Sequence, residues 1–464
     1  MSGPAQPAMA IGPMGAATIA GIAVGVVYAL SPLTVLFAIA MAVMLRWAVR
    51  GIDGDERKWL LVLLIGAVVV RVAAVALLFA STNHAQVPFG SFFGDEEYFI
   101  KRAIWLRNVG TGLPVHGADL IYAFDEYSAT SYLYVLAFVQ FLVGTAPYGV
   151  HLVGIAFYLF GAILLYRVVR SSFGRMPAFI GLAIVLLMPT LFAWSISALK
   201  DPLFFALSAV TLSGAVNLVR ARLWRHRFVA AGAVALLCVV LATVRQGGAV
   251  LVIASIALGY AVAALVIRPR VLLASIVVLP IVIGAIMSRP PVQLRAYNAV
   301  QAAAGQHWGH VATPGWVYKL LDDRLYPDRS EILDLRAGEA LRFLVRAVTG
   351  YVTVPLPWDA QSTPALAYLP EQLFWYVLVA LFVPGVLFAF RRDALVAALL
   401  FGYAMVAALM VAVTSGNVGT LIRHRGLALP YIVWLSAVGA CELLTAARGT
   451  AGAPAHALPA RTLS

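Results

Sequence analysis

The sequence predicts an all-α polytopic membrane protein, and two observations carry this prediction. Of its 464 residues, 62% are hydrophobic and 11% are charged, whereas soluble globular chains are about half apolar and about a quarter charged. A helix needs about 20 apolar residues to cross the hydrocarbon of a bilayer, and segments of that length recur along most of the chain. We therefore expect a bundle of about 11–12 transmembrane helices, with interfacial helices on its outer face.

The N-terminus begins with an apolar stretch at residues 8–46. This stretch is too long for one ordinary span, and Ser31-Pro32 can turn it into a hairpin, with a single span as the alternative. Ten further spans are expected at 59–81, 149–169, 177–199, 203–219, 228–244, 248–267, 271–288, 372–390, 394–413 and 427–445.

These spans divide the chain into five regions. The regions are an N-terminal hairpin with a cytoplasmic loop at 1–58, a transmembrane module at 59–288 that includes an outer loop at 82–148, a large outer loop at 289–371, C-terminal transmembrane helices at 372–445, and a disordered cytoplasmic tail at 446–464.

The formal net charge of +13 indicates membrane topology. When the loop at 46–58 is placed in the cytoplasm and the later spans alternate, 17 of the 33 Lys and Arg residues fall on the inner side, together with only 5 of the 20 acidic residues. The inner side then carries +12 of the net charge, as the positive-inside tendency predicts. The basic balance therefore indicates an orientation in the membrane and no nucleic-acid partner.

Residues 130–146 are apolar enough to span the membrane but do not fit this alternation. Counting them as a span would invert every later loop and place the basic cluster at 220–227 outside. Their aromatic residues suit a helix that lies at the outer interface. We expect such an interfacial helix, and a true span compensated elsewhere is the alternative.

Three consecutive carboxylates, Asp95, Glu96 and Glu97, lie in the first outer loop. They are expected to open a helix, because Asp95 can cap free backbone amides and acidic side chains suit the positive first turn. Glu97 is spaced to pair with Lys101 at i, i+4. The run either caps a surface helix or supplies a general base or metal ligand at the membrane boundary. For that chemistry we favour Asp95, then Glu96.

A second carboxylate, Asp201, lies at the outer end of a predicted span, in the sequence Lys200-Asp201-Pro202. Proline in the first turn predicts a helix–turn–helix junction, so Asp201 either caps the next helix or converges with the acidic run. Cations on the same edge either bind phosphate oxygens or snorkel to the interface. These cations are Lys200, Arg245, Arg423, His424 and Arg425.

These motifs resemble the GT-C superfamily of membrane glycosyltransferases, notably bacterial relatives of protein O-mannosyltransferases and lipid A aminoarabinose transferases. The Asp-Glu-x-x-aromatic motif of that family matches Asp95 to Phe99, and its second Asp matches Asp201. The resemblance covers residues 59–220 and includes Tyr166-Arg167 and Phe173-Gly174-Arg175, with looser matches at Pro357-Trp358 and from Arg423 to Pro430.

The resemblance implies an inverting transfer of a sugar from a polyprenyl-phosphate carrier to a glycan, lipid or protein acceptor, on the periplasmic face of a bacterial inner membrane. By the match, Asp95 is the general base, and Glu96 and Asp201 assist positioning or contact a divalent metal ion. Lys200 departs from the family pattern and can put an ammonium where relatives use a metal, so Asp95 and Asp201 are metal ligands only if a metal is present.

Two other classes of function stay open on the sequence. A transporter or lipid flippase would be favoured by polar residues in mid-span, which are few apart from Arg71. A non-catalytic subunit of an envelope polysaccharide system is the other alternative. Arg71 itself needs an internal partner or water within the bilayer.

Overall fold

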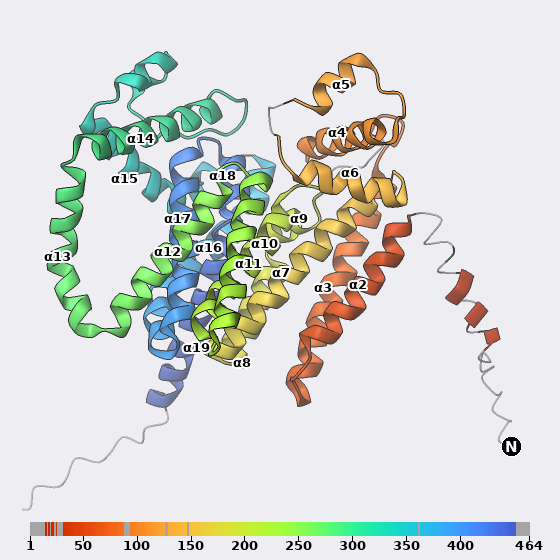
Figure 1. The fold of residues 1–464 in the computed structure, drawn as a ribbon, viewed down its shortest axis with the longest axis horizontal. Helices are drawn as coiled ribbons and strands as arrows, with labels where there is room; N and C mark the ends of the chain where they lie inside the picture. Colours follow the sequence, from red (N-terminus) through yellow and green to blue (C-terminus); the bar gives the residue numbers. More distant parts are fainter. Residues whose placement is uncertain are drawn as a thin grey trace, which may run out of the picture. The chain divides into compact units, whose positions relative to one another are not determined.

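The computed structural model describes residues 31–87, 93–125, 129–145, 148–360 and 362–451, with scattered positions between 14 and 25. Regular structure within these residues is helical, and the only β pairing among them is an isolated bridge between Val317 and Asn417 (Figure 1). The predicted all-α class is therefore confirmed.

Eight of the described helices are long and apolar enough to cross a membrane, which confirms a multi-pass membrane protein. Two further pairs, α8 with α9 and α13 with α14, bend by 67° and 89° and would raise the number of spans to ten. The eight helices are α3 (Gly54–Ser81), α7 (Gly149–Phe173), α10 (Asp201–Arg220), α11 (Trp224–Val244), α12 (Gly248–Ile267), α16 (Thr363–Arg392), α17 (Ala394–Thr414) and α19 (Leu429–Ala451).

The predicted span at 177–199 is not one continuous helix. Helix α8 (Arg175–Leu187) ends before Pro189, and α9 (Pro189–Ser195) continues at an angle of 67°. Proline lacks an amide hydrogen and clashes with the preceding turn, so it breaks the helix here. Residues 196–200 then form a non-helical turn that leads into α10. The predicted segment is therefore a bent helix pair, and its outer part, residues 196–199, is a buried turn.

Helices α2 (Pro32–Ala48) and α19 lie near the two ends of the chain. Helix α2 begins at the predicted turn, where the Ser31 side chain accepts a hydrogen bond from the Leu33 amide. Most of the first arm of the predicted hairpin lies outside the described residues. The predicted tail at 446–464 starts too early, because α19 continues to Ala451; residues 452–464 lie outside the described residues.

The chain divides into two compact units. Unit 1 comprises residues 1–160 and 195–203, and unit 2 comprises residues 161–194 and 204–464. The turn after α9 therefore belongs to unit 1, although it is distant in sequence from the rest of that unit.

In unit 1, α4 (Gly94–Thr111) packs against α5 (Gly117–Ala123) and α6 (Tyr132–Val143). Helix α6 has 12 residues, so it is about 18 Å long and too short to cross about 30 Å of hydrocarbon. Leu133 and Leu136 are buried, whereas Tyr134 and Phe138 are exposed. The prediction that 130–146 is not a span is confirmed, and its aromatic exposed face suits an interface.

In unit 2, the closest helix pairs are α12 with α17 and α16 with α19. Glycine allows both contacts. A Cβ atom at Gly402 would lie 2.3 Å from the Ser255 carbonyl oxygen, and one at Gly439 would lie 2.3 Å from the Leu381 carbonyl oxygen. Small residues at such crossings let helix backbones approach closely where lipid provides no hydrophobic drive.

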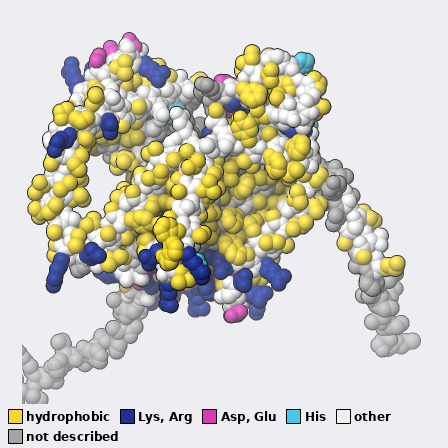
Figure 2. Space-filling model, in the orientation of Figure 1, with side chains coloured by type: hydrophobic (Ala, Val, Ile, Leu, Met, Phe, Trp, Pro, Cys, Tyr) yellow, Lys and Arg dark blue, Asp and Glu magenta, His cyan; other side chains and the backbone are white. Residues whose placement is uncertain are grey.

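One end of unit 2 is rich in cations, and Figure 2 shows Lys and Arg side chains near the ends of α8, α11 and α19. Arg392 donates to the Phe173 carbonyl at 2.6 Å and pairs with Glu442, while Arg220 pairs with Asp393. The ends of α7, α10, α16 and α19 therefore meet, as the predicted alternation requires. That this end faces the cytoplasm stays a prediction of the charge count.

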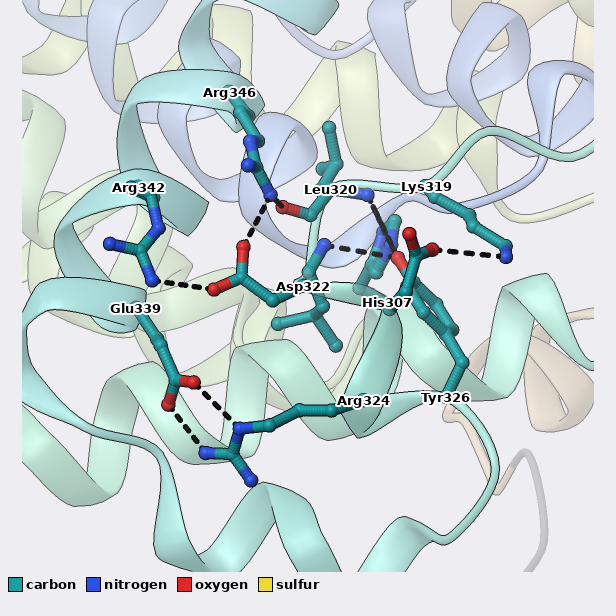
Figure 3. A network of polar contacts seen from close by, with 11 residues as sticks. His307, Lys319, Leu320, Asp322, Arg324, Tyr326, Glu339, Arg342 and Arg346 are labelled. Carbon is teal, nitrogen blue, oxygen red and sulfur yellow. Dashed lines mark hydrogen bonds and ion pairs between the residues drawn. The ribbon is translucent and has the colours of Figure 1, made fainter.

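The opposite end of unit 2 carries a folded polar cap. It comprises α14 (Pro290–Val311), the short helices η1 (Asp323–Leu325) and η2 (Arg329–Asp334), and α15 (Ala337–Thr353). The Arg324 guanidinium binds both oxygens of Glu339 at 2.7 Å (Figure 3). The large loop predicted at 289–371 is therefore an ordered substructure.

His307 is the buried centre of this cap. Its Nδ1 donates to the Ser415 carbonyl at 2.7 Å, and its Nε2 accepts from the Tyr326 hydroxyl at 3.0 Å. The same hydroxyl accepts from the Leu320 and Leu321 amides. Burial lowers the pKa of His307 to about 4, and the neighbouring charge of His310 acts in the same direction. The imidazole is therefore neutral, and it joins α14 to the end of α17.

Replacement of Gly439 or Gly402 by Ala should destabilise the bundle. Each added methyl group would clash with a backbone carbonyl that cannot move independently, and overpacking of this kind costs about 1–3 kcal/mol. The thermal unfolding midpoint in detergent measures the effect. The control is Gly284→Ala on α13 (Pro269–Met287), where no atom lies within 4 Å of the new Cβ. Equal midpoints for all three variants would contradict the close contacts.

The stability of the cap should depend on the protonation of His307. Since its pKa in the fold lies below the ordinary value of 6.5, the stabilisation is complete above about pH 6.5 and is lost as the pH falls towards 4. Protection factors of residues 312–336, which remove the intrinsic pH dependence of amide exchange, should fall between pH 7 and 4.5. His307→Asn should lower these protection factors at pH 7 and remove most of their pH dependence in this window. A wild-type profile that is flat over this range would refute the assignment.

Candidate active site

The three carboxylates at the start of α4 have three different environments. Asp95 is exposed, Glu96 is fully buried, and Glu97 is half-buried. Glu97 pairs with Lys101 at 2.6 Å, as the sequence predicts. The N-cap residue of α4 is Phe93, and the Oε2 atom of Glu96 accepts a hydrogen bond from its amide at 3.5 Å. Glu96 therefore has the capping role that we predicted for Asp95. The run therefore presents Asp95 to the solvent and holds Glu96 inside the protein.

Glu96 also binds the turn that follows α9. Its Oε1 atom accepts from the Ala198 amide at 3.0 Å, and the Tyr132 hydroxyl on α6 donates to the Ala198 carbonyl at 3.0 Å. One residue of the turn is thus bound through both of its backbone groups. Burying a carboxylate is costly unless it accepts hydrogen bonds, and the turn supplies one of them.

Two other elements of unit 1 hold the same turn. On α7, the Nδ1 of His151 donates to the Ile196 carbonyl at 2.9 Å. On α3, the Nε of Arg71 donates to the Ser195 hydroxyl at 2.8 Å, and its guanidinium lies 5.6 Å from the centre of the Tyr158 ring. Arg71 is fully buried and has the internal partner that the sequence required. Its contacts give it a structural role.

The turn brings Lys200 and Asp201 to the start of α4. The Lys200 ammonium lies 5.8 Å from the centre of the Phe99 ring on α4. Burial raises the pKa of Tyr132 well above its usual range, and the negative charges of Glu96 and Asp201 both add to this effect. Two carboxylates from distant parts of the sequence therefore act on one phenol. A shared site of Asp201 with Asp95 stays a prediction.

Four of the predicted cations, Arg245, Arg423, His424 and Arg425, belong to unit 2. Arg245 follows α11, and its guanidinium lies 5.8 Å from the centre of the Phe204 ring. Helix α18 (Val418–Arg425) carries Arg423 and His424, both partly exposed. The Arg423 guanidinium lies 4.7 Å from the centre of the Trp194 ring on α9. Such stacking orients a guanidinium whose charge is retained.

Arg425 has the strongest structural role among these cations. It is buried, donates to the Tyr351 carbonyl from Nε and Nη2, and donates to Gln372 from Nη1. It also donates to the Val354 carbonyl. Every nitrogen of the guanidinium therefore has a protein acceptor. Phosphate binding by Arg425 stays a prediction, but these contacts favour its role as an anchor between α18 and α15.

Several of these residues were missed in the sequence. Tyr132 was assigned only to the interfacial aromatic group, and His151 was one polar residue in a predicted span. Glu371 on α16 is buried and accepts from the Thr190 amide at 3.0 Å, next to the Pro189 break. The signal for this contact was Pro189 itself, since a broken helix leaves amides that need acceptors.

A metal site at Asp95 and Asp201 would need further donor side chains. No group of three or more His, Cys, Asp or Glu side chains that could hold a metal ion occurs among the described residues. Asp95 and Asp201 thus have no third such donor there, and we derive no step through a metal.

Comparison with known proteins gives no assignment. The sequence matches no protein family, and neither the curated proteins nor the solved structures contain a match.

Replacing Glu96 by Ala should destabilise unit 1, because the buried Ala198 amide would lose its acceptor. A buried unsatisfied amide costs about 1–3 kcal/mol. Glu96→Gln retains a side-chain oxygen and should keep most of the stability. Glu97→Gln is the control, since partly exposed ion pairs contribute at most about 1 kcal/mol. Thermal unfolding in detergent compares the three, and a Glu96→Ala protein as stable as Glu97→Gln would disprove the role of this hydrogen bond.

Proposed function

We propose that this protein is an integral membrane glycosyltransferase that transfers a sugar from a polyprenyl-phosphate-linked donor to an acceptor hydroxyl on the outer face of the membrane. The observation that carries the proposal is the cluster at the start of α4. Buried Glu96 is bound to the Ala198 amide, and Asp95 is exposed next to it. The same turn leads directly to Lys200 and Asp201. The resemblance to GT-C enzymes adds the substrate class.

The chemistry needs one base and one group that stabilises the leaving phosphate. Asp95 accepts the proton of the acceptor hydroxyl, while the oxygen of that hydroxyl forms a bond to the anomeric carbon. The bond from that carbon to the phosphate oxygen breaks, and the electron pair leaves with the phosphate. Attack from the opposite side inverts the anomeric centre. A positioned general base typically contributes about 10²–10⁴-fold to the rate.

The other candidate residues divide between positioning and charge stabilisation. Glu96 is a positioning residue, since it holds the turn that precedes Lys200. Asp201 starts α10 and orients the acceptor or Lys200. Lys200 is the unit 1 candidate for stabilising the leaving phosphate, and its ammonium lies 5.8 Å from the centre of the Phe99 ring on α4. Arg245, Arg423 and His424 of unit 2 stay phosphate-binding candidates on the sequence alone; within unit 2, the ring contact of Arg423 orients its guanidinium.

The cellular setting is part of the proposal. A multi-pass protein with 82–148 and 289–371 on the outer side suits the inner membrane of a bacterium, with the reaction on the periplasmic face. The apolar helices would accommodate the prenyl chain of the donor.

The alternative function, a transporter, has little support. Its only sequence support was Arg71 in mid-span, and the contacts of Arg71 with Ser195 and Tyr158 account for that residue structurally. A non-catalytic role in polysaccharide assembly remains the alternative that loss of Asp95 can test.

Replacement of Asp95 by Asn should lower the transfer rate by about 10²–10⁴-fold at normal protein abundance, because the amide cannot accept the proton. Mass spectrometry of cell-envelope glycans and prenyl-phosphate sugars in a deletion strain complemented with each variant measures this. The strain with Asp95→Asn should accumulate the donor and contain a shortened glycan.

The matched control is Glu97→Gln, a neighbouring carboxylate that pairs with Lys101. It should restore the wild-type glycan. Full activity of Asp95→Asn at wild-type abundance would refute the assignment of the base. Substrate translocation by purified protein in liposomes, without any sugar transfer, would establish the transporter instead.

A further inference from the structure

Unit 2 contains an apolar groove, and none of the residues assigned to sugar transfer lines it. Its volume is about 320 Å³, and it is lined by side chains of α12, α15, α16, α17 and α19. Trp375 and Phe382 on α16 and Met405 and Leu409 on α17 form much of its wall. A lining of this kind offers no partner for a polar group, so the groove suits a hydrocarbon chain.

Helix α15 connects this groove to the surface of unit 2. Leu341, Val345 and Val348 are 64%, 58% and 52% exposed. They lie at i, i+4 and i+7, so they share one face of the helix. Val348 and Val352, one turn further on the same face, line the groove. An exposed apolar stripe thus leads along α15 into the groove.

Two arginines flank this stripe on the same helix. Arg342 and Arg346 are one turn apart and both bind Asp322, through Nη2 at 2.6 Å and Nη1 at 2.8 Å (Figure 3). The bridging carboxylate holds the two guanidinium groups side by side, and their hydrogen bonds lower its pKa, that of Arg342 most. Their side chains are 54% and 46% exposed. Two cations and one carboxylate leave a net charge of +1 beside the apolar stripe.

We propose that this surface binds an anionic phospholipid of the surrounding bilayer, with an acyl chain in the groove and the phosphate at Arg342 and Arg346. Each arginine uses one terminal nitrogen for Asp322, and its other terminal nitrogen can donate to a phosphate oxygen. Arginine suits this role because its planar group donates two hydrogen bonds to such oxygens. The apolar stripe of α15 contacts the part of the acyl chain that lies nearest to the headgroup.

Charge and location favour a bilayer phospholipid as the occupant. The two partly exposed guanidinium groups of Arg342 and Arg346 favour an anionic headgroup over a zwitterionic one. Exposed hydrophobic side chains also occur along α13, another helix of unit 2 (Figure 2). In a membrane such a surface is solvated by phospholipids, whose local concentration exceeds that of any carrier lipid. The site is also built from residues other than those assigned to sugar transfer.

The test measures lipid binding by the delipidated full-length protein. Phosphatidylglycerol should raise the thermal midpoint and appear in native mass spectra, and chain-matched phosphatidylcholine should bind more weakly. Arg342→Gln combined with Arg346→Gln should lower the affinity for phosphatidylglycerol by about tenfold, since hydrogen bonds between charged groups are lost. Val348→Trp should lower the affinity for both lipids, because the larger side chain fills the groove. The matched controls are Arg295→Gln on α14 and Val277→Trp on α13.

Asp322→Asn separates lipid binding from the structural role of the ion pairs. It removes the bridging charge but keeps both cations, so it should lower the stability of the cap and leave phosphatidylglycerol binding undiminished. Equal binding of the two phospholipids, or equal loss in Asp322→Asn and the double arginine variant, would overturn the proposal. Undecaprenyl phosphate binding here in preference to phosphatidylglycerol would also overturn it. Asp95→Asn should retain the lipid effect, so failure of this proposal and failure of the proposed transferase function are distinguishable.

Discussion

The buried carboxylate of Glu96 is the interaction on which the candidate active site depends. An ionised group in the interior is stable only when its oxygens accept hydrogen bonds, and Glu96 accepts from Ala198 and from Phe93. The first of these joins two segments that lie about a hundred residues apart in the sequence. By holding the turn after α9, Glu96 brings the start of α10 to the start of α4, where Asp95 faces the solvent. The position of the proposed base thus follows from the burial of its neighbour.

Buried polar side chains have the same purpose elsewhere in this apolar chain. Arg71 and His151 hold the turn of unit 1, and Arg425 and Glu371 hold breaks and helix ends in unit 2. In each case the side chain binds a backbone or hydroxyl group at a place where regular helix ends. Helices satisfy their own backbone, but breaks leave amides and carbonyls that have no partner in lipid. Charged residues are few here, and the buried ones are placed where the backbone needs them.

The cap of unit 2 shows a different use of charge. Its ion pairs lie at the surface, and such pairs contribute little stability individually. Asp322 nevertheless gives Arg342 and Arg346 a common orientation next to an apolar stripe, and His307 ties the cap to α17. A surface with one apolar face and one cationic face is suited to the boundary of a membrane. The cap can therefore interact with lipid independently of the chemistry proposed for unit 1.

The fold class, nearly all of the spans and the helix that begins at the acidic run could be predicted from the sequence. These features depend on local hydrophobicity and on residue preferences at helix starts, which are present in any short window. The sequence also determined the Glu97–Lys101 pair and the exclusion of 130–146 from the spans, because helical spacing and charge alternation are sequence properties. The tertiary structure alone decided that Glu96 is buried while Asp95 is exposed, that Pro189 breaks a span, and that Arg425 is enclosed by carbonyl groups. Adjacent residues of similar type differ in these respects because their partners come from distant segments, and a buried charge takes its role from the groups that solvate it.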